Sequence, residues 1–340
     1  MRFFLAAILA AAAAGTAAAQ NSHTGDFTFR EQSTTGNFGF QQQQSTGRFE
    51  LNVDLGSMSQ SGVLDELVAL ATTKTGGPIV AYGYDQNTGL IVGTTDPNVG
   101  LLTINATKDG PGRGEITIVI SANDGLRKPV SVRSDGLEVF RDNLEPVCFE
   151  QETVQSAPVK ISVALLLDRS GSMDPYKATV TDVATRFLNA MPRTAQCQLT
   201  SFSGSDRVER HTRDFQQCSP GAHNPGMQAR ESTGTDFYTP LVETYRTIRQ
   251  DDPTQAVTIL VTDGETTETP HKRTDVTSAK TGRTFVYWAG KHGQRGRQQL
   301  RGIADTFLSE EEKIEEAMRA YFEGISTQLT AQTVLIVKDC

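Results

Sequence analysis

The sequence lacks the short motifs by which many enzymes and metalloproteins are recognised. It contains no GxSxG, HExxH or GxxxxGK[ST] motif and no CxxC pair, and its five histidines are scattered in polar contexts that are typical of the surface. The formal net charge of −8 argues against a protein that binds nucleic acid through its phosphates. Beyond residue 14, no apolar run approaches the roughly 20 residues that span a bilayer. We therefore expect a mature chain without a membrane span and without a nucleic-acid partner.

The first nineteen residues have the layout of a targeting segment. Arg2 precedes an apolar run from Phe3 to Ala14, and Ala17–Ala19 offers small residues for cleavage before Gln20. This arrangement predicts a secretory signal peptide at 1–19, with an uncleaved anchor as the alternative. The predicted location is secreted or periplasmic.

Four cysteines become informative in an exported chain, because disulfides form and persist in oxidising compartments. Four cysteines allow three pairings. We favour Cys148–Cys340 and Cys197–Cys218, because each pair joins segments that we expect to lie near one another.

Residues 20–57 are polar and repeat a short pattern. Thr-Gly-x-Phe occurs three times at a spacing of eleven residues, ending at Phe27, Phe38 and Phe49. Each phenylalanine is followed two residues later by another apolar residue, and this alternation predicts three short strands joined by turns. A disordered, low-complexity leader is the alternative.

Residues 58–147 are predicted to form a small all-β region after a short helix at 62–71. Turn-forming Gly, Asn and Asp residues separate short apolar runs, as in a small antiparallel sandwich or barrel. The candidate strands are Ile79–Tyr84, Gly89–Gly93, Leu101–Ala106, Gly114–Ser121 and Val130–Arg133.

From residue 157 to 340 the pattern changes to strands that alternate with helices. Such alternation predicts a Rossmann-like, mostly parallel sheet that is flanked by helices on both faces, so the fold class is α/β. The candidate strands are Val159–Leu167, Ala256–Thr262, Phe285–Ala289 and Thr333–Val337, with a hairpin over Cys197–Phe202 and Val208–Phe215. The candidate helices are Tyr176–Met191, Pro240–Arg249, Arg297–Leu308 and Glu310–Leu329.

Three segments near the ends of these elements carry oxygen-bearing side chains. Asp168, Ser170 and Ser172 follow the first buried strand, Thr235 precedes a helix, and Asp263 follows the second buried strand. Ligands of open α/β sheets gather at the carboxyl ends of the strands, so we expect these segments to converge. Hydroxyl and carboxylate oxygens suit a hard divalent cation such as Mg²⁺, with Mn²⁺ or Ca²⁺ as alternatives.

The Asp-x-Ser-x-Ser loop, the later threonine and the Thr-Asp-Gly segment together resemble the metal-ion-dependent adhesion site of von Willebrand factor type A domains. The resemblance covers roughly residues 157–340, and all five family positions are matched by Asp168, Ser170, Ser172, Thr235 and Asp263. It implies a metal whose open position is filled by a partner's carboxylate. It also implies a disulfide between the ends of the domain, in agreement with Cys148–Cys340.

The leading hypothesis is an exported, non-enzymatic binding protein that captures a protein partner presenting Asp or Glu. One alternative is a structural subunit of a surface layer or fimbria, in which the Thr-Gly-x-Phe repeat and the β region assemble. The other is a metal-assisted hydrolase, because a bound cation can activate water. No general base is clearly associated with the site in the sequence, which favours binding.

The cysteine pairing can be tested directly. Peptide mapping of the unreduced mature protein should yield cross-linked peptides that join Cys148 to Cys340 and Cys197 to Cys218. A peptide that joins Cys148 to Cys197 would contradict this pairing.

Overall fold

The computed structural model describes residues 31–32, 35–41, 48–53, 78–126, 128–141, 145–204, 208–226, 235–264, 269–290 and 293–338. The predicted signal peptide, the first Thr-Gly-x-Phe repeat, the candidate helix at 62–71 and Cys340 lie outside these ranges.

The centre of the larger domain is a block of five parallel strands in the order β16-β15-β14-β10-β11. Every residue of β10 and β14 is buried, because both faces of the sheet are covered. The block therefore has the parallel arrangement that the sequence predicts. Its strands are β10 (Ile161–Asp168), β11 (Ala195–Phe202), β14 (Gln255–Thr262), β15 (Arg283–Ala289) and β16 (Thr306–Glu310).

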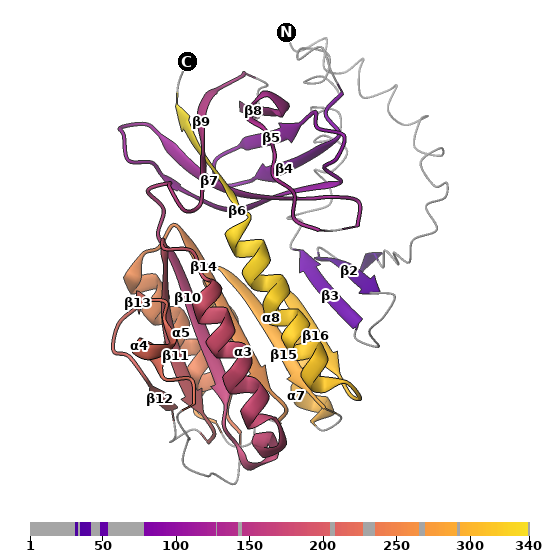
Figure 1. Ribbon diagram of the computed structural model, residues 1–340, viewed down its shortest axis with the longest axis vertical. Helices are drawn as coiled ribbons and strands as arrows, with labels where there is room; N and C mark the ends of the chain where they lie inside the picture. Colours follow the sequence, from indigo (N-terminus) through magenta and orange to yellow (C-terminus); the bar gives the residue numbers. More distant parts are fainter. Residues whose placement is uncertain are drawn as a thin grey trace.

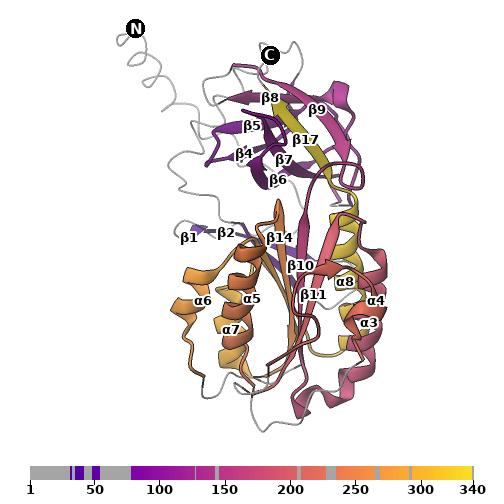
Figure 2. The same cartoon turned by 90° about the vertical axis from the view of Figure 1, so that its left-hand side faces the viewer.

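Helices cover both faces of this sheet (Figure 2). On one face, α3 and α8 pack against each other, and the rings of Phe187 and Phe322 meet edge to face at 5.6 Å between centroids. On the other face, the buried Trp288 of β15 shares a core with residues of α5, α6 and α7. The helices are α3 (Lys177–Ala190), α5 (Tyr238–Asp251), α6 (Arg273–Ala279), α7 (Gln294–Arg301) and α8 (Ile314–Thr330), with a short α4 (Pro220–His223) and a 3₁₀ turn η4 (Gly171–Tyr176).

Antiparallel strands extend the sheet at both edges. Beside β11 lie β12 (Val208–Arg210) and β13 (Gln216–Gln217). Beside β16 lies β3 (Arg48–Val53), followed by β2 (Thr35–Gln41) and β1 (Glu31–Gln32). The hairpin of β2 and β3 occurs where the second and third Thr-Gly-x-Phe repeats predict strands, and it occupies a sheet edge that would otherwise expose unpaired backbone groups.

The smaller domain, called here the β domain, contains two antiparallel sheets that share one hydrophobic core. One sheet has the order β6-β7-β17-β9 and the other β4-β5-β8. The expected strand at Val130–Arg133 is absent among the described residues of that segment, where Pro129 makes only an isolated bridge to Asn123. The strands are β4 (Ala81–Asp85), β5 (Leu90–Thr94), β6 (Leu101–Asp109), β7 (Ile116–Asn123), β8 (Leu137–Arg141), β9 (Cys148–Thr153) and β17 (Thr333–Lys338), with a 3₁₀ turn η3 (Ser134–Gly136) before β8.

The last strand does not lie where the sequence interpretation puts it. We expected Thr333–Val337 to complete the α/β sheet, but β17 inserts between β7 and β9 of the β domain and pairs antiparallel with both. Val334 packs in the α/β core, whereas Leu335 and Val337 pack in the core of the β domain. The chain therefore leaves the β domain at β9, forms the α/β domain and returns in β17 (Figure 1).

The expected helix Arg297–Leu308 is also wrong in its second half. Helix α7 ends at Arg301, Gly302 follows, and the chain then forms β16 parallel to β15. Leu300, Ile303 and Phe307 lie at spacings that continue a helical pattern, but they come from α7, the turn after it and β16, and they pack in one core. The spacing alone could not reveal the break.

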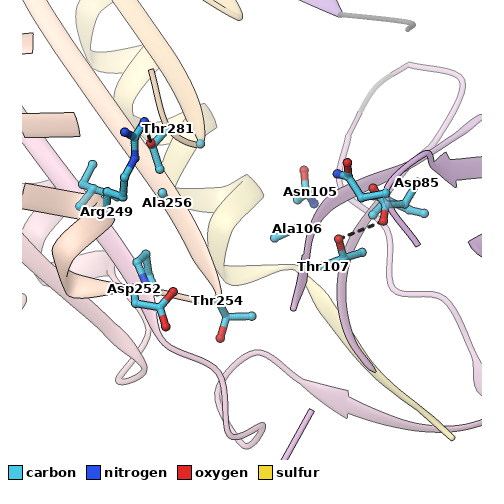
Figure 3. Close-up of a pocket in the computed structure, with 14 residues that line it drawn as sticks. Asp85, Asn105, Ala106, Thr107, Arg249, Asp252, Thr254, Ala256 and Thr281 are labelled. Atoms are coloured by element: carbon cyan, nitrogen blue, oxygen red, sulfur yellow. Dashed lines mark hydrogen bonds between the residues drawn. The ribbon is translucent and has the colours of Figure 1, made fainter. Parts of the chain in front are cut away.

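Polar contacts join the two domains beside a hollow of about 400 Å³ (Figure 3). The guanidinium of Arg283 donates to Oδ1 of Asn105 at 2.7 Å, and Lys108 pairs with Asp252 at 2.8 Å. In Figure 3, Asn105 and Thr107 of β6 form one wall, opposite residues of the α/β domain. This junction lies at the amino ends of β10 and β14, away from Asp168 at the other end of β10 (Figure 1).

No helix in the described part of the chain is both long and apolar enough to cross a membrane.

The position of β17 predicts which substitutions destabilise the β domain. Leu335 is fully buried in β17, so Leu335→Ala should lower the free energy of unfolding by about 2–5 kcal/mol, measured by urea denaturation followed by circular dichroism. Leu101→Ala is the control, because Leu101 is 42% exposed and should cost about 0.5 kcal/mol or less. Equal effects of the two substitutions would contradict this placement of β17.

Candidate functional site

The register of two parallel strands brings the first and third candidate segments together. Leu167 of β10 pairs with Val261 of β14, so Asp168 ends β10 next to Thr262 at the end of β14. Asp263 is the next residue, which places it at the same carboxyl edge of the sheet. Neighbouring parallel strands that end together thus deliver two carboxylates to one place.

The carboxylate of Asp168 is buried but well supplied with donors. The Thr262 hydroxyl donates to its Oδ2 at 2.5 Å, and the amide of Ser170 donates to its Oδ1 at 2.8 Å. Burial raises the pKa of Asp168 to about 6, and the charge of Asp263 also raises it, whereas these hydrogen bonds lower it. A cation at this position would offset both the burial and the repulsion.

A chain of hydroxyls connects the first loop to Asp263. The Ser172 hydroxyl donates to Oδ1 of Asp263 at 2.7 Å, and the hydroxyls of Ser170 and Ser172 are 3.1 Å apart. The hydroxyl of Ser170 also hydrogen-bonds to Asp168, so the two serines connect the carboxylates of Asp168 and Asp263. Ser170 and Asp263 are buried, whereas Ser172 is exposed. The site therefore opens to solvent on the side of Ser172.

Thr235 reaches the site from a third segment. A methyl group at Gly264 would overlap the hydroxyl of Thr235, so that hydroxyl lies against the Asp263–Gly264 turn. The next residue, Asp236, fixes the beginning of α5: its amide donates to the carbonyl of Ser203 at 2.7 Å, and its Oδ1 accepts from the amide of Tyr238 at 2.9 Å. All three predicted segments thus meet at one edge of the sheet.

This donor set fits a hard divalent cation. Two carboxylates and three hydroxyls are present, which are the oxygen ligands that Mg²⁺ and Mn²⁺ accept. In the part of the chain that the structure describes, no group of three or more His, Cys, Asp or Glu side chains could hold a metal ion, so the hydroxyls are essential to any such site. The contiguous hydroxyl chain and the buried carboxylates are the features that the ion would need.

The segment between β12 and Pro225 packs against β11. Cys197 of β11 and Cys218 form the disulfide that the sequence favours, whereas the histidine contacts of this segment were missed. Cys148 is disulfide-bonded as well, and its expected partner Cys340 lies outside the described residues. His223 was expected at the surface, yet its ring is fully buried, with Nδ1 2.9 Å from the carbonyl of Ser219 and Nε2 2.8 Å from that of Cys197.

His211 completes this packing. Its Nδ1 donates to the carbonyl of His223 at 2.8 Å, and its Nε2 lies 2.8 Å from the hydroxyl of Ser201. Burial lowers the pKa of His211, and the charge of Arg169 lowers it further, which favours a neutral ring that accepts the Ser201 proton. Nothing in the sequence around His211 or His223 signals this role, because each ring bonds to backbone carbonyls that are distant along the chain.

Part of the α/β domain matches a known protein family. Residues 163–265 match the family model described as the von Willebrand factor type A domain. The match begins in β10 and ends just after Gly264, so it includes all five predicted ligand positions. No curated protein matches the chain.

Several solved structures are similar at low identity. A von Willebrand factor type A protein from Catenulispora acidiphila is 14% identical with a TM-score of 0.43, over 73% of this chain and 52% of that one. Proximal thread matrix protein 1 from the mussel byssus, with a zinc-occupied MIDAS motif, is 18% identical with a TM-score of 0.40, over 56% and 50%. The pilus adhesin SpaC from Lactobacillus rhamnosus GG is 14% identical with a TM-score of 0.43, over 69% and 35%. The chain spans about half the length of the Catenulispora acidiphila protein and of two further structures of proximal thread matrix protein 1.

The family match and the parallel sheet with helices on both faces lead to one conclusion about the architecture. The α/β part of the chain has the von Willebrand factor type A fold, and a β-rich region precedes it.

Proposed function

We propose that this chain is an exported binding protein that captures a protein partner through a divalent cation, Mg²⁺ in the first instance. Asp168, Ser170, Ser172, Thr235 and Asp263 would hold the cation, and an Asp or Glu carboxylate of the partner would complete its coordination. The bound cation would supply a positive centre to which an anionic oxygen binds. The proposed activity is binding rather than catalysis.

The observation that carries the proposal is the hydroxyl of Ser172. It lies 3.1 Å from the hydroxyl of Ser170 and 2.7 Å from the carboxylate of Asp263, so it joins ligands from two separate strands. A cation bound to the lone pairs of these hydroxyls would be surrounded by oxygens that already lie close together. Pre-organised ligands reduce the free energy spent on ordering the site.

The charge of the ligand set supports an external carboxylate. Three of the five oxygens come from neutral hydroxyls, so two carboxylates are the only formal negative charges among the proposed ligands. Because the other predicted ligands are buried and only Ser172 is exposed, a partner would approach from its side.

The position of the site in the molecule also supports a contact function. Asp168 lies at the end of β10 that points away from the β domain, so the described β domain does not cover this edge (Figure 1). A partner could therefore dock on the metal edge while the β domain stays at the opposite end.

Isothermal titration with Mg²⁺ and Mn²⁺ tests the cation site on the full mature chain. The protein should bind one cation, and Ser170→Ala or Asp263→Asn should abolish detectable binding, because each removes a proposed ligand of the cation. Ser156→Ala is the control, since Ser156 is exposed and contacts Thr153 away from the site. If the unaltered protein binds neither cation, the proposed function is wrong.

A pair of glycine substitutions tests the position of Thr235. A methyl group at Gly264 would overlap the hydroxyl of Thr235, whereas one at Gly171 would meet open space. Gly264→Ala should weaken Mn²⁺ binding by about tenfold or more, because it displaces a ligand, and Gly171→Ala should leave the affinity nearly unchanged. Equal affinities of the two variants would show that Thr235 does not bind the cation.

A further inference from the structure

Arg169 lies between two proposed ligands, and its side chain points away from them into the protein. It is only 3% exposed. Its amide donates to the carbonyl of Phe202 at 2.7 Å, at the end of β11. Its Nη2 donates to the carbonyl of Pro225 at 2.5 Å. One residue therefore ties the metal loop, defined as Asp168–Ser172, both to a neighbouring strand and to a distant segment.

The buried guanidinium is costly for the fold. Arg169 is 3% exposed, with one hydrogen bond from its Nη2 to the carbonyl of Pro225, and burying a charged group away from water costs free energy. Its Nε is buried without a hydrogen-bond partner. An apolar side chain of similar length would fill the same space without these penalties, and such replacements are often neutral or stabilising. General packing therefore does not account for an arginine here.

The acceptor of this arginine belongs to a firmly held segment. Residues 211–226, called here the strap, are joined to β11 by the Cys197–Cys218 disulfide. His223 adds a contact to the carbonyl of Cys197, and His211 one to Ser201. The carbonyl of Pro225 is thus a fixed point, and Arg169 connects the metal loop to it.

We propose that Arg169 is a positioning residue of the metal site, which transmits the rigidity of the strap to the hydroxyls of Ser170 and Ser172. The inference rests on the proposed cation site, since Arg169 itself does not touch the cation. The hydrogen bonds to Phe202 and Pro225 restrain both the backbone and the side chain of Arg169, and through it the backbone orientation of the two serines that follow. Removing a contact that orients a metal ligand without touching the metal typically changes metal affinity about 10–100-fold.

Two substitutions separate the hydrogen bond from packing. Arg169→Met keeps much of the apolar stem but removes the donor, and it should weaken Mn²⁺ binding by about tenfold with little loss of thermal stability. Arg169→Lys keeps a donor that can reach the carbonyl of Pro225, so it should restore the affinity to within about threefold of the unaltered protein. Arg186→Gln, at an exposed arginine of α3 bonded to Asp182, is the matched control. Unchanged Mn²⁺ affinity in Arg169→Met would overturn the proposal.

A double-mutant cycle tests the route through the strap. The Cys197→Ser/Cys218→Ser protein should bind Mn²⁺ more weakly than the unaltered protein, but the same change should have no further effect in the Arg169→Met background, because the strap acts through Arg169. If the Cys197→Ser/Cys218→Ser protein does not fold, His223→Gln is used in its place, because His223 also joins the strap to β11. Independent, multiplicative losses of affinity would show that the strap acts by another route and would overturn this assignment.

Amide hydrogen exchange in the metal-free protein separates failure of this inference from failure of the proposed function. The amide of Ser170 donates to Asp168, and that of Met173 donates to the carbonyl of Ser170. Both should exchange several-fold faster in Arg169→Met and at the original rate in Arg169→Lys. Faster exchange in a protein that binds no cation would support the positioning role while removing the proposed function. Unchanged exchange rates would overturn the positioning role.

Discussion

The parallel pairing of β10 with β14 is the constraint on which the candidate site depends. The register that aligns Leu167 with Val261 places Asp168 beside Thr262, and the next residue in the chain is Asp263. A shift of this register by one residue would turn alternate side chains to the opposite face and separate the two carboxylates. The buried apolar residues of both strands hold the register, so the hydrophobic core determines where the charged groups meet.

Hydroxyl groups make this close approach of carboxylates tolerable. Two buried negative charges repel each other, and the raised pKa of Asp168 reflects both its burial and the charge of Asp263. Thr262 and Ser172 each donate to one of these carboxylates. The oxygen of Ser172, which is also a proposed ligand, would turn a lone pair toward a bound cation. A site of this composition therefore keeps its carboxylates hydrogen-bonded and presents oxygens of the kind that a divalent cation accepts.

Much of this site could be predicted from the sequence, because its signals are local. Asp168 and Asp263 each follow a continuous apolar run, and the rule for parallel sheets brings such positions together. The fate of Thr333–Val337 could not be predicted in this way: its apolar pattern shows that the strand is buried but not which sheet accepts it. Strand β16, which contains Phe307, could not be recognised, because its apolar residues continue the helical spacing of α7. Arg169 and His223 contact backbone carbonyls. Every residue has such a carbonyl, so no sequence pattern identifies these partners.

The return of the chain in β17 makes the β domain discontinuous. Its third strand in the β6-β7-β17-β9 sheet comes from the far side of the whole α/β domain, almost 180 residues after the preceding strand β9. During synthesis the β domain therefore stays incomplete until β17 has been made, whereas the strands and helices of the α/β domain are all made before it. A fragment cut between β9 and β10 would leave each piece with a defect: one would expose an unfilled gap in its sheet, and the other would carry an orphan strand.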